Sequence, residues 1–488
     1  MRLNELINTL KIEYIGIFLI LFAIFYSPLD FLINDPDSGF FVSGANRILY
    51  FNDIPQVDFK SQYGPLLFYL TSFFMSITSS IRGFVVLCFC GYFFSYLFFY
   101  KSSLFITKSK FISLSITIAA IFFIGPFYKF FNFLLPISLV YIAFHFKDFE
   151  RNVVIIFFAF ITALAFLYRL DFSIYCAFFV LLFLYSNFNL RAILAFFIIF
   201  MLFCLPWLLI INLSYGLDNY FFELYRYFTE YPQSFSFPFS SLSFISKLNY
   251  LFFFSIPLSL ILIKNKFHHI DQLIILFSLI LLVPCLIRSD ISHLFQSSFL
   301  SFLLLSFFFN PSFNDYHQKF YRLIFFFPLI IIYLNNDNLR QLNFFSLRAP
   351  LNIYSFTLIP NKSDALLNQK LIVKIKQCSK PFDRVAVFPY QPQLSFFSDR
   401  ISGGLSMDVS SKYMNSTQDQ LQIYSSLNSQ GVKLILIDDS FVIQGENFRS
   451  FSTVLNKKIE SSFIKLGSIE SYSFYYNLSE GNYYPSCF

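Results

Sequence analysis

Charged residues are scarce in this chain. They make up 13% of its 488 residues, whereas 56% are hydrophobic and 77 are Phe, and the mean hydropathy is +0.62. No single soluble core of this size requires so much apolar surface, so a wholly soluble protein is excluded. Long apolar runs recur along the first two thirds, and about 20 helical residues cross a hydrocarbon core of roughly 30 Å. The composition predicts a polytopic membrane protein.

Cysteine motifs of the metal-binding or redox type are missing. The chain has 7 cysteines, but none forms a CxxC pair and none lies near a pair of histidines. Five cysteines fall inside apolar runs, where they are expected to pack as small apolar side chains. The other two, Cys378 and Cys487, could pair only if the tail lies in an oxidising compartment.

The first apolar run lacks a cleavage site. It begins near Tyr14 and contains Phe25, Tyr26 and Pro28 without a small-residue site after it, so we expect a retained helix and not a removed signal peptide. The net charge of +7 is spread over the loops, which disfavours nucleic acid as a partner. No internal repeat with a fixed period is visible.

The apolar runs predict about eleven membrane crossings. Their expected ranges are 14–33, 82–100, 111–126, 132–146, 152–167, 172–187, 192–213, 246–263, 270–287, 293–309 and 322–334. The fold class is therefore an all-α polytopic membrane core, residues 1–334, with a small soluble α/β domain after it.

Basic residues predict the orientation of this core. Four loops carry two or more of them and are expected in the cytoplasm, namely 101–110, 147–151, 264–266 and 310–322. The alternate connections carry one each, Lys129, Arg169 and Arg288, and fall outside with the long loop 214–245. The N-terminus is then cytoplasmic in an inner (plasma) membrane, and the first loop, 34–64, is extracytoplasmic. An odd number of crossings must separate Asp58 from Lys101, so we expect 64–80 to lie along the membrane interface or to dip into it.

The amino-acid composition changes near residue 335, where Ser, Asn, Gln, Lys and Asp become common. The β-branched runs 384–388 and 432–438 predict strands, and the apolar spacing of 417–428 predicts a helix that Gly431 closes. Residues 335–488 are therefore expected to form an extracytoplasmic α/β domain.

Ionisable residues gather at the outer helix ends. The candidate site residues are Asp35, Asp37, Asp58 and Lys60 in the first loop, and Arg169, Asp171, Arg288, Asp290 and His293 in later ones. Charges near membrane depth usually pair with each other or line a cavity. The two Arg-x-Asp pairs are either structural ion pairs or arginines that hold a phosphate, whose oxygens a guanidinium binds in bidentate fashion.

The first loop carries a family resemblance. "NDPDSGFFVSGANRILYFNDIPQVDFKSQYGPLLFYL" (34–70) resembles the first extracytoplasmic loop of GT-C glycosyltransferases, polytopic enzymes that take sugar from a polyprenyl-phosphate carrier. The matching parts are Asp37, Phe41, Ala45, Asn52, "IPQVDF" and "QYGPLLFYL". The later "RLD" (169–171) and "RSDISH" (288–293), and the tail segment "FPYQPQLSFFSDR" (388–400), are similar to later parts of that class.

The resemblance implies roles for these residues. Asp37 would be the base for the acceptor hydroxyl in an inverting displacement, with Asp35 as its alternative, and Asp58 would orient the loop or the acceptor. Lys60, Arg169 and Arg288 would face the donor phosphate, and the acceptor would be a lipid, a glycan or a protein. Pro36 separates the two aspartates, and Lys129 and Asn132 stand where several relatives have a second carboxylate, so a divalent metal ion stays an open possibility.

Plainer alternatives exist for these residues and for the function. Asp37 could be a helix N-cap, although Asp35 is the better candidate for a supporting or capping role. His293 could be a capped helix residue and not a hydrogen-bond donor or metal ligand. A transporter or flippase would place charges within its spans and would often show repeats. An O-antigen-type polymerase or ligase would use the 214–245 loop with Arg226 and Glu230. A non-catalytic assembly protein would use the tail for binding.

Overall fold

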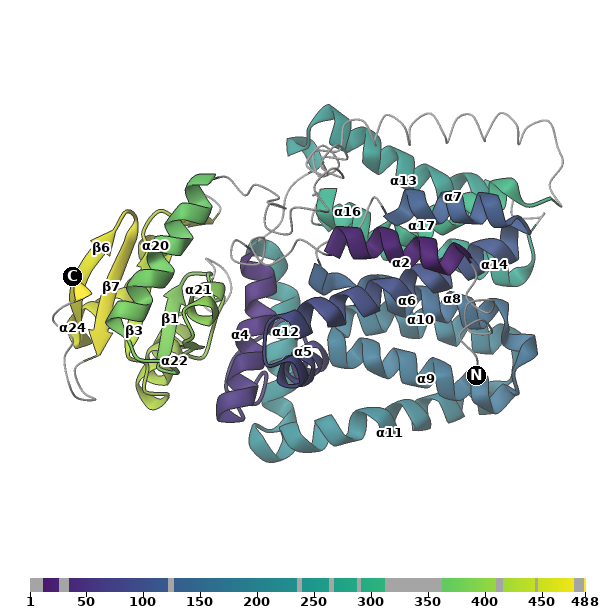
Figure 1. The fold of residues 1–488 in the computed structure, drawn as a ribbon. Coiled ribbons are helices and arrows are strands. Elements are labelled where there is room, and N and C mark those ends of the chain that lie inside the picture. Colours follow the sequence, from purple (N-terminus) through teal and green to yellow (C-terminus); the bar gives the residue numbers. More distant parts are fainter. Residues whose placement is uncertain are drawn as a thin grey trace, which may run out of the picture. The chain divides into compact units, whose positions relative to one another are not determined.

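The computed structural model divides the chain into two compact units (Figure 1). It describes residues 12–25, 35–121, 127–234, 239–262, 267–287, 291–311, 362–409, 416–443, 446–477 and 487–488. The first unit comprises Met1–Tyr26, Cys88–Pro206 and Phe237–Phe356, and the second comprises Ser27–Leu87, Trp207–Ser236 and Thr357–Phe488. The expected domain boundary at residue 335 lies outside the described residues and stays a prediction.

The first unit is helical in all its described elements. Its α-helices are α2 (Ile12–Phe25), most of α6 (Arg82–Thr107), α7 (Lys110–Ile121), α8 (Phe131–Phe144), α9 (Arg151–Tyr168), α10 (Leu170–Asn187), most of α11 (Leu190–Ser214), α13 (Phe244–Leu262), α14 (His269–Leu282), α15 (Pro284–Ile287), α16 (Ile291–Ser297) and α17 (Phe299–Leu304). Short 3₁₀ turns add η1 (Phe127–Lys129), η2 (Phe146–Asp148), η3 (Phe239–Ser241) and η5 (Leu305–Phe309).

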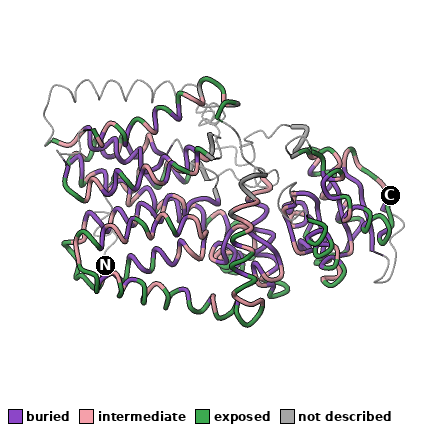
Figure 2. Tube along the Cα trace, turned by 180° about the vertical axis from the view of Figure 1, so that it is seen from behind, coloured by how far each residue is buried: buried purple, intermediate pink, exposed green. Residues whose placement is uncertain are grey.

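Five of the described helices are long and apolar enough to cross a membrane. They are Arg82–Thr107, Arg151–Tyr168, Leu170–Asn187, Leu190–Ser214 and His269–Leu286. Only 17% of the most apolar stretch of α11 is buried by protein, and exposed residues run along it in Figure 2, as expected of a lipid-facing helix. The all-α membrane core is thus confirmed in type, whereas the number of eleven crossings is not, and the 322–334 span lies outside the described residues.

Two of the expected spans are interrupted. α14 ends at Leu282 shortly before Pro284, which lacks the amide hydrogen that would continue the helix. The 293–309 stretch is divided into α16, α17 and η5, and at the division the Ser298 hydroxyl donates to the Phe295 carbonyl, a local bond that competes with the helix ladder. α17 is buried along its whole length and packs against α7, α8, α13 and α14.

The second unit contains a five-stranded sheet with the order β2-β1-β3-β7-β6. Its strands are β1 (Arg384–Phe388), β2 (Ile401–Ser402), β3 (Leu434–Asp438), β6 (Phe463–Ile469) and β7 (Tyr472–Asn477), and β4 (Val442–Ile443) pairs with β5 (Glu446–Asn447) separately. β1 is parallel to β2 and β3, whereas β7 is antiparallel to β3 and β6. The two predicted strands are confirmed as β1 and β3.

Helices cover both faces of this sheet. Its helices are α20 (Lys362–Cys378), α21 (Gln393–Phe397), α22 (Thr417–Ser429), α23 (Phe448–Phe451) and α24 (Thr453–Ser462). Because successive strand residues point to opposite faces, Val385 and Val387 pack with α20 and α21, while Ala386 and Phe388 pack with α22, α23 and α24. Burial on both faces explains the unbroken apolar runs of β1 and β3, and α22 confirms the predicted helix.

The second unit also contains three helices from outside the tail. They are α4 (Pro36–Phe51), α5 (Pro65–Thr78) and α12 (Leu217–Ser234), the last within the expected 214–245 loop. The 14 residues of α5 extend about 21 Å, short of a roughly 30 Å hydrocarbon core. One of its faces exposes Tyr69, Phe73 and Ile77. Both features agree with an interfacial position for 64–80, which stays a prediction.

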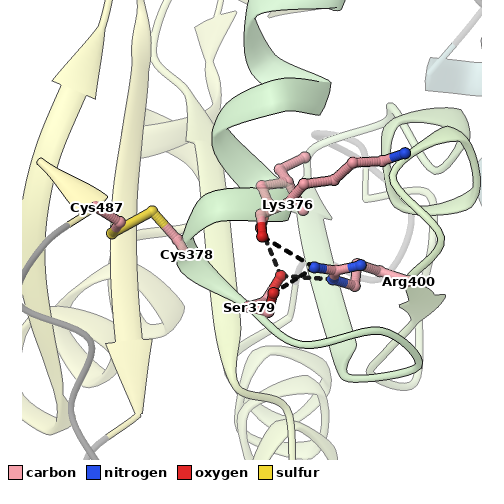
Figure 3. Close-up of a disulfide and its surroundings, with 6 residues drawn as sticks. Lys376, Cys378, Ser379, Arg400 and Cys487 are labelled. Carbon is pink, nitrogen blue, oxygen red and sulfur yellow. Dashed lines mark hydrogen bonds between the residues drawn. A yellow bond between two sulfur atoms is a disulfide. The ribbon is translucent and has the colours of Figure 1, made fainter.

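A disulfide fixes the end of the chain to α20. Cys378 and Cys487 are bonded, 109 residues apart in sequence, with their Cα atoms 5.2 Å apart. Figure 3 shows Arg400 next to Ser379 and Lys376 at the end of α20, where its guanidinium donates to the carbonyl oxygens of both residues. These carbonyls would otherwise lack partners at a helix C-terminus.

Removal of the disulfide is expected to destabilise the tail. A bond that closes a loop of 109 residues restricts the unfolded chain, so the Cys378→Ser, Cys487→Ser double variant should lose about 2–5 kcal/mol. Thermal unfolding with and without reductant measures the effect, with Cys90→Ser as the control because Cys90 is free. If the wild-type protein, purified without reductant, reacted with maleimide at both cysteines, the bond and the oxidising location of the tail would both be rejected.

Candidate active site

α4 begins at Asp35 and Asp37, the first two aspartates of the first loop. Asp35 is its N-cap: the carboxylate accepts hydrogen bonds from the Asp37 amide, at 3.1 Å, and from the Ser38 hydroxyl. Pro36 occupies the first helical position, where its missing amide hydrogen costs nothing. The N-cap alternative considered for Asp37 therefore applies to Asp35 instead. Asp37 lies in the first turn of α4.

A tyrosine from the tail contacts Asp37. The Tyr390 hydroxyl donates to Asp37 Oδ1 at 2.6 Å, across 353 residues of sequence. α21 packs on α4 close to this bond: the Ser43 hydroxyl donates to the Pro392 carbonyl at 2.8 Å. A Cβ at Gly39 would lie only 2.4 Å from Gln393 Cβ, so glycine is needed there for the close approach.

Tyr390 and Lys60 line the same hollow. Its volume is about 260 Å³, it is open to solvent, and its wall also includes Phe40, Gln62, Tyr227 and Asp408. The hollow therefore combines residues from the first loop, α12 and the tail, all within the second unit. It has a buried ammonium group on its wall, together with the tyrosine that is hydrogen-bonded to Asp37.

Lys60 is held by two residues near or on α12. Its Nζ donates to the Tyr215 hydroxyl at 2.6 Å and forms an ion pair with Glu223 at 3.3 Å. Its backbone amide donates to the Leu405 carbonyl at 2.7 Å. Lys60 and Glu223 also line a second hollow of about 280 Å³. These contacts fix the position of the ammonium group, with only 6% of its side chain exposed.

Asp58 orders the first loop. Its carboxylate accepts from the Ile54 amide at 2.6 Å, and its backbone carbonyl accepts from Arg47 and Gln430. These are contacts within the protein, and they agree with the expectation that Asp58 orients the loop. They do not test whether it contacts an acceptor.

A buried ion cluster connects the first loop with the tail. Asp53 accepts from Arg47 at 2.7 Å and from both terminal nitrogens of Arg384 at 3.0 Å. Arg47 also donates to the Gly404 carbonyl and to Gln430. Burial lowers the pKa of Arg47 to about 10. Sequence reasoning assigned no role to Arg47, Asp53 or Arg384. Arg47 and Asp53 are 6 positions apart, but the pair of Asp53 with Arg384 joins positions 331 residues apart, which one sequence does not reveal.

A second ion cluster connects α12 with α22. Both terminal nitrogens of Arg226 bind the carboxylate of Asp419, at 2.9 and 2.8 Å. Arg226 also makes two hydrogen bonds to Glu230, and these charged partners raise its pKa. Asp419 belongs to the capping box that begins α22. Arg226 and Glu230 therefore have structural partners, which weakens the polymerase or ligase alternative that relied on them.

The first unit holds the remaining candidates. Arg169 forms a two-bond ion pair with Asp171 where α9 meets α10, which is the structural arrangement considered for this motif. Lys129 Nζ lies 3.4 Å from His293 Nε2, and Asn132 donates to Gln296 at 3.3 Å. Arg288 and Asp290 lie outside the described residues.

The described residues do not provide a metal site. Among them, no three His, Cys, Asp or Glu side chains come together. His293 Nε2 faces an ammonium group, which would repel a cation at that nitrogen. The two loop aspartates are engaged with Ser38 and Tyr390. Within the described ranges the donor set therefore offers no divalent metal site, and we assign no step to a metal.

Asp35 is expected to make stability depend on pH. Burial raises its pKa to about 6, and the neighbouring Asp37 carboxylate adds to the increase. Protonated Asp35 therefore contributes its full stabilisation of the folded state at acid pH, and this stabilisation is lost as pH rises through about 6. Asp35→Asn keeps the N-cap acceptor but cannot ionise, so its thermal midpoint should rise relative to wild type between pH 4 and 7. A difference independent of pH would contradict this.

Comparison with known proteins identifies the fold. No protein-family model matches the chain, and no curated protein matches it. Among solved structures, ArnT from Cupriavidus metallidurans, crystallised in the apo state, is similar over 96% of this chain and 98% of its own, with a TM-score of 0.51 and 10% sequence identity. The likeness covers the helical core and the tail alike. The chain therefore shares the fold of this ArnT, in agreement with the GT-C-like architecture that the sequence of its first loop predicts.

Proposed function

We propose that this protein is a membrane glycosyltransferase that uses a polyprenyl-phosphate-sugar donor. It transfers the sugar to a lipid, glycan or protein acceptor on the extracytoplasmic face of the membrane. The observation that carries the proposal is the Asp37–Tyr390 bond beside the hollow lined by Lys60. A carboxylate and a fixed ammonium group in one compact unit are the two kinds of group that this reaction needs.

The chemistry explains why these two groups suffice. The phosphate of the donor is already a good leaving group, so no acid has to protonate it. The reaction needs a cation to stabilise the departing phosphate and a base to remove the proton of the acceptor hydroxyl. We assign the base to Asp37, which attacks no carbon itself, so one displacement inverts the configuration at the sugar carbon.

Lys60 is the phosphate ligand that the geometry favours. Its ammonium group lies at the wall of the hollow and is held by Tyr215 and Glu223. Arg169 and Arg288 remain candidates for the same phosphate. Arg169 would have to share its guanidinium with Asp171, its present partner. Asp35 is assigned to the cap of α4, and Asp58 to the order of the loop.

A transporter or flippase fits the charge distribution less well. In the described membrane helices the ionisable residues lie within about two turns of a helix end, as Lys101 in α6 and Asp271 in α14 illustrate. Ionisable groups that carry a substrate are expected near the middle of the spans. The distribution favours chemistry at a surface of the core over passage through it.

The direct test is sugar transfer with purified components. The full-length protein in lipid vesicles would be incubated with radiolabelled polyprenyl-phosphate sugars and extracted envelope acceptors. Comparison of envelope glycan and lipid composition with and without the protein selects the sugar and the acceptor. Loss of a single modification is expected when the protein is absent. Unchanged composition, together with movement of a labelled lipid-linked glycan across vesicles that contain the protein, would support a flippase and reject the enzyme.

A further inference from the structure

We propose that Tyr390, from the C-terminal domain, is a positioning residue that holds the Asp37 base for the reaction. The inference rests on the proposed function and deepens it, because it makes the tail a part of the active site. Tyr390 does not touch the reacting atoms in this proposal. Its hydroxyl fixes one oxygen of the carboxylate and thereby sets the direction of the base.

Contacts with α4 hold the backbone of the tail in the position that places the Tyr390 hydroxyl next to Asp37. Gly39 lets the backbone at Gln393 approach α4, and any larger residue at position 39 would meet it. Ser43, one turn further along α4, binds the Pro392 carbonyl at 2.8 Å. The Tyr390 ring lies 6.3 Å from the ring of Phe40, centre to centre. Three contacts on one face of α4 thus anchor the segment that carries Tyr390.

The hydrogen bond from Tyr390 to Asp37 is strong enough to restrain the carboxylate. A phenol donor 2.6 Å from a carboxylate oxygen is a charge-assisted bond, shorter and stronger than a neutral one. An aspartate side chain turns about two torsions, so a hydrogen bond to one of its oxygens restricts its orientation. A catalytic group must be held to within about 0.5 Å and 10–20° of its productive geometry. The same tyrosine lines the hollow with Lys60, so the residue that holds the base also borders the hollow that carries the cation.

Tyr390→Phe tests the hydroxyl alone, since the ring and its packing on Phe40 are kept. Without this hydrogen bond Asp37 is held less firmly, so kcat should fall by about tenfold. This loss is smaller than the 10²–10⁴-fold effect of removing a general base. KM for the lipid donor should not change, because the hydroxyl is assigned to the base and not to the donor. Tyr424→Phe is the matched control: it removes a tyrosine hydroxyl that donates to Ser462 at 2.6 Å in the same unit, away from the hollow, so kcat should stay at the wild-type value.

Thermal unfolding of the full-length protein tests the contact without any assay of transfer. Asp37→Ala and Tyr390→Phe each remove one partner of the hydrogen bond, so each should lower the midpoint, and the double variant should lose less than the sum of the two. Additive losses would overturn the inference. Wild-type kcat in Tyr390→Phe, with Asp37→Asn inactive, would also overturn it and leave the proposed function intact. Full activity in Asp37→Asn would reject Asp37 as the base, and the inference would fall with it.

Discussion

Asp37→Asn is expected to abolish sugar transfer while the protein still accumulates in the membrane. The amide has nearly the shape of the carboxylate and can still accept the Tyr390 hydrogen bond, but it cannot take up the proton of the acceptor hydroxyl. The loss of a general base costs about 10²–10⁴-fold in rate. Radiolabel transferred per mole of vesicle-reconstituted protein measures the effect, and the amount of folded protein is measured by size-exclusion chromatography.

Two further variants make this result specific. Asp218→Asn, at an exposed acidic position on α12 in the same unit, controls for the loss of one charge and should transfer at the wild-type rate. Asp35→Asn decides between the two loop aspartates. Because Asn caps a helix as well as Asp does, it should retain most of the activity if Asp35 is only the cap. If Asp35→Asn were inactive and Asp37→Asn active, the assignment of the base would be reversed.

Asp53→Asn is expected to cause the largest loss of stability. The substitution leaves the guanidinium groups of Arg47 and Arg384 buried without their counter-charge. Removal of one partner from a buried ion pair typically costs about 3–5 kcal/mol, because the remaining charge is uncompensated. Since the cluster joins the first loop to the tail, the second unit should unfold at a lower temperature. Thermal midpoints in detergent at pH 7 measure the loss.

An exposed ion pair in the same unit gives the matched comparison. Asp399 pairs with Lys376 at 2.7 Å, but 71% of its side chain is exposed, so Asp399→Asn should cost less than about 1 kcal/mol. The same chemical change is thus made at a buried and at an exposed pair. Equal midpoints for the two variants would show that the Asp53 cluster contributes no more than a surface pair.

Local patterns predicted much of the secondary structure. The apolar runs marked the positions of α6 to α11, α13 and α14, because a helix that faces lipid needs continuous apolar residues. β1 and β3 were predicted because strands buried on both faces are apolar throughout. β6 and β7 were not predicted. Much of β6 is exposed or half-buried, so its sequence lacks such a run, although the aromatic residues of β7 at 472–476 were an available signal.

The candidate site was predicted only in part. The first loop was predicted to carry the site because it places carboxylates beside an apolar run. Sequence reasoning preferred Asp35 for a supporting or capping role but kept an N-cap role for Asp37 as an alternative, because either aspartate has the spacing that a cap requires. It also missed Tyr390, Arg384 and Asp419, although the tail segment around Tyr390 was noted as similar to GT-C tails. Each of these residues acts through a partner more than 190 positions away, and a single sequence carries no signal of that pairing.

The sequence by itself determined the membrane core, the α/β tail and the first-loop carboxylates, since hydropathy and strand patterns are local properties. Only the tertiary structure decided which residues face each other. It gave Asp35 the N-cap of α4, joined Asp53 to Arg384 and brought Tyr390 to Asp37. The physical reason is that a buried charge or a short hydrogen bond depends on distance in space, and the folded backbone sets that distance through contacts such as the one Gly39 permits.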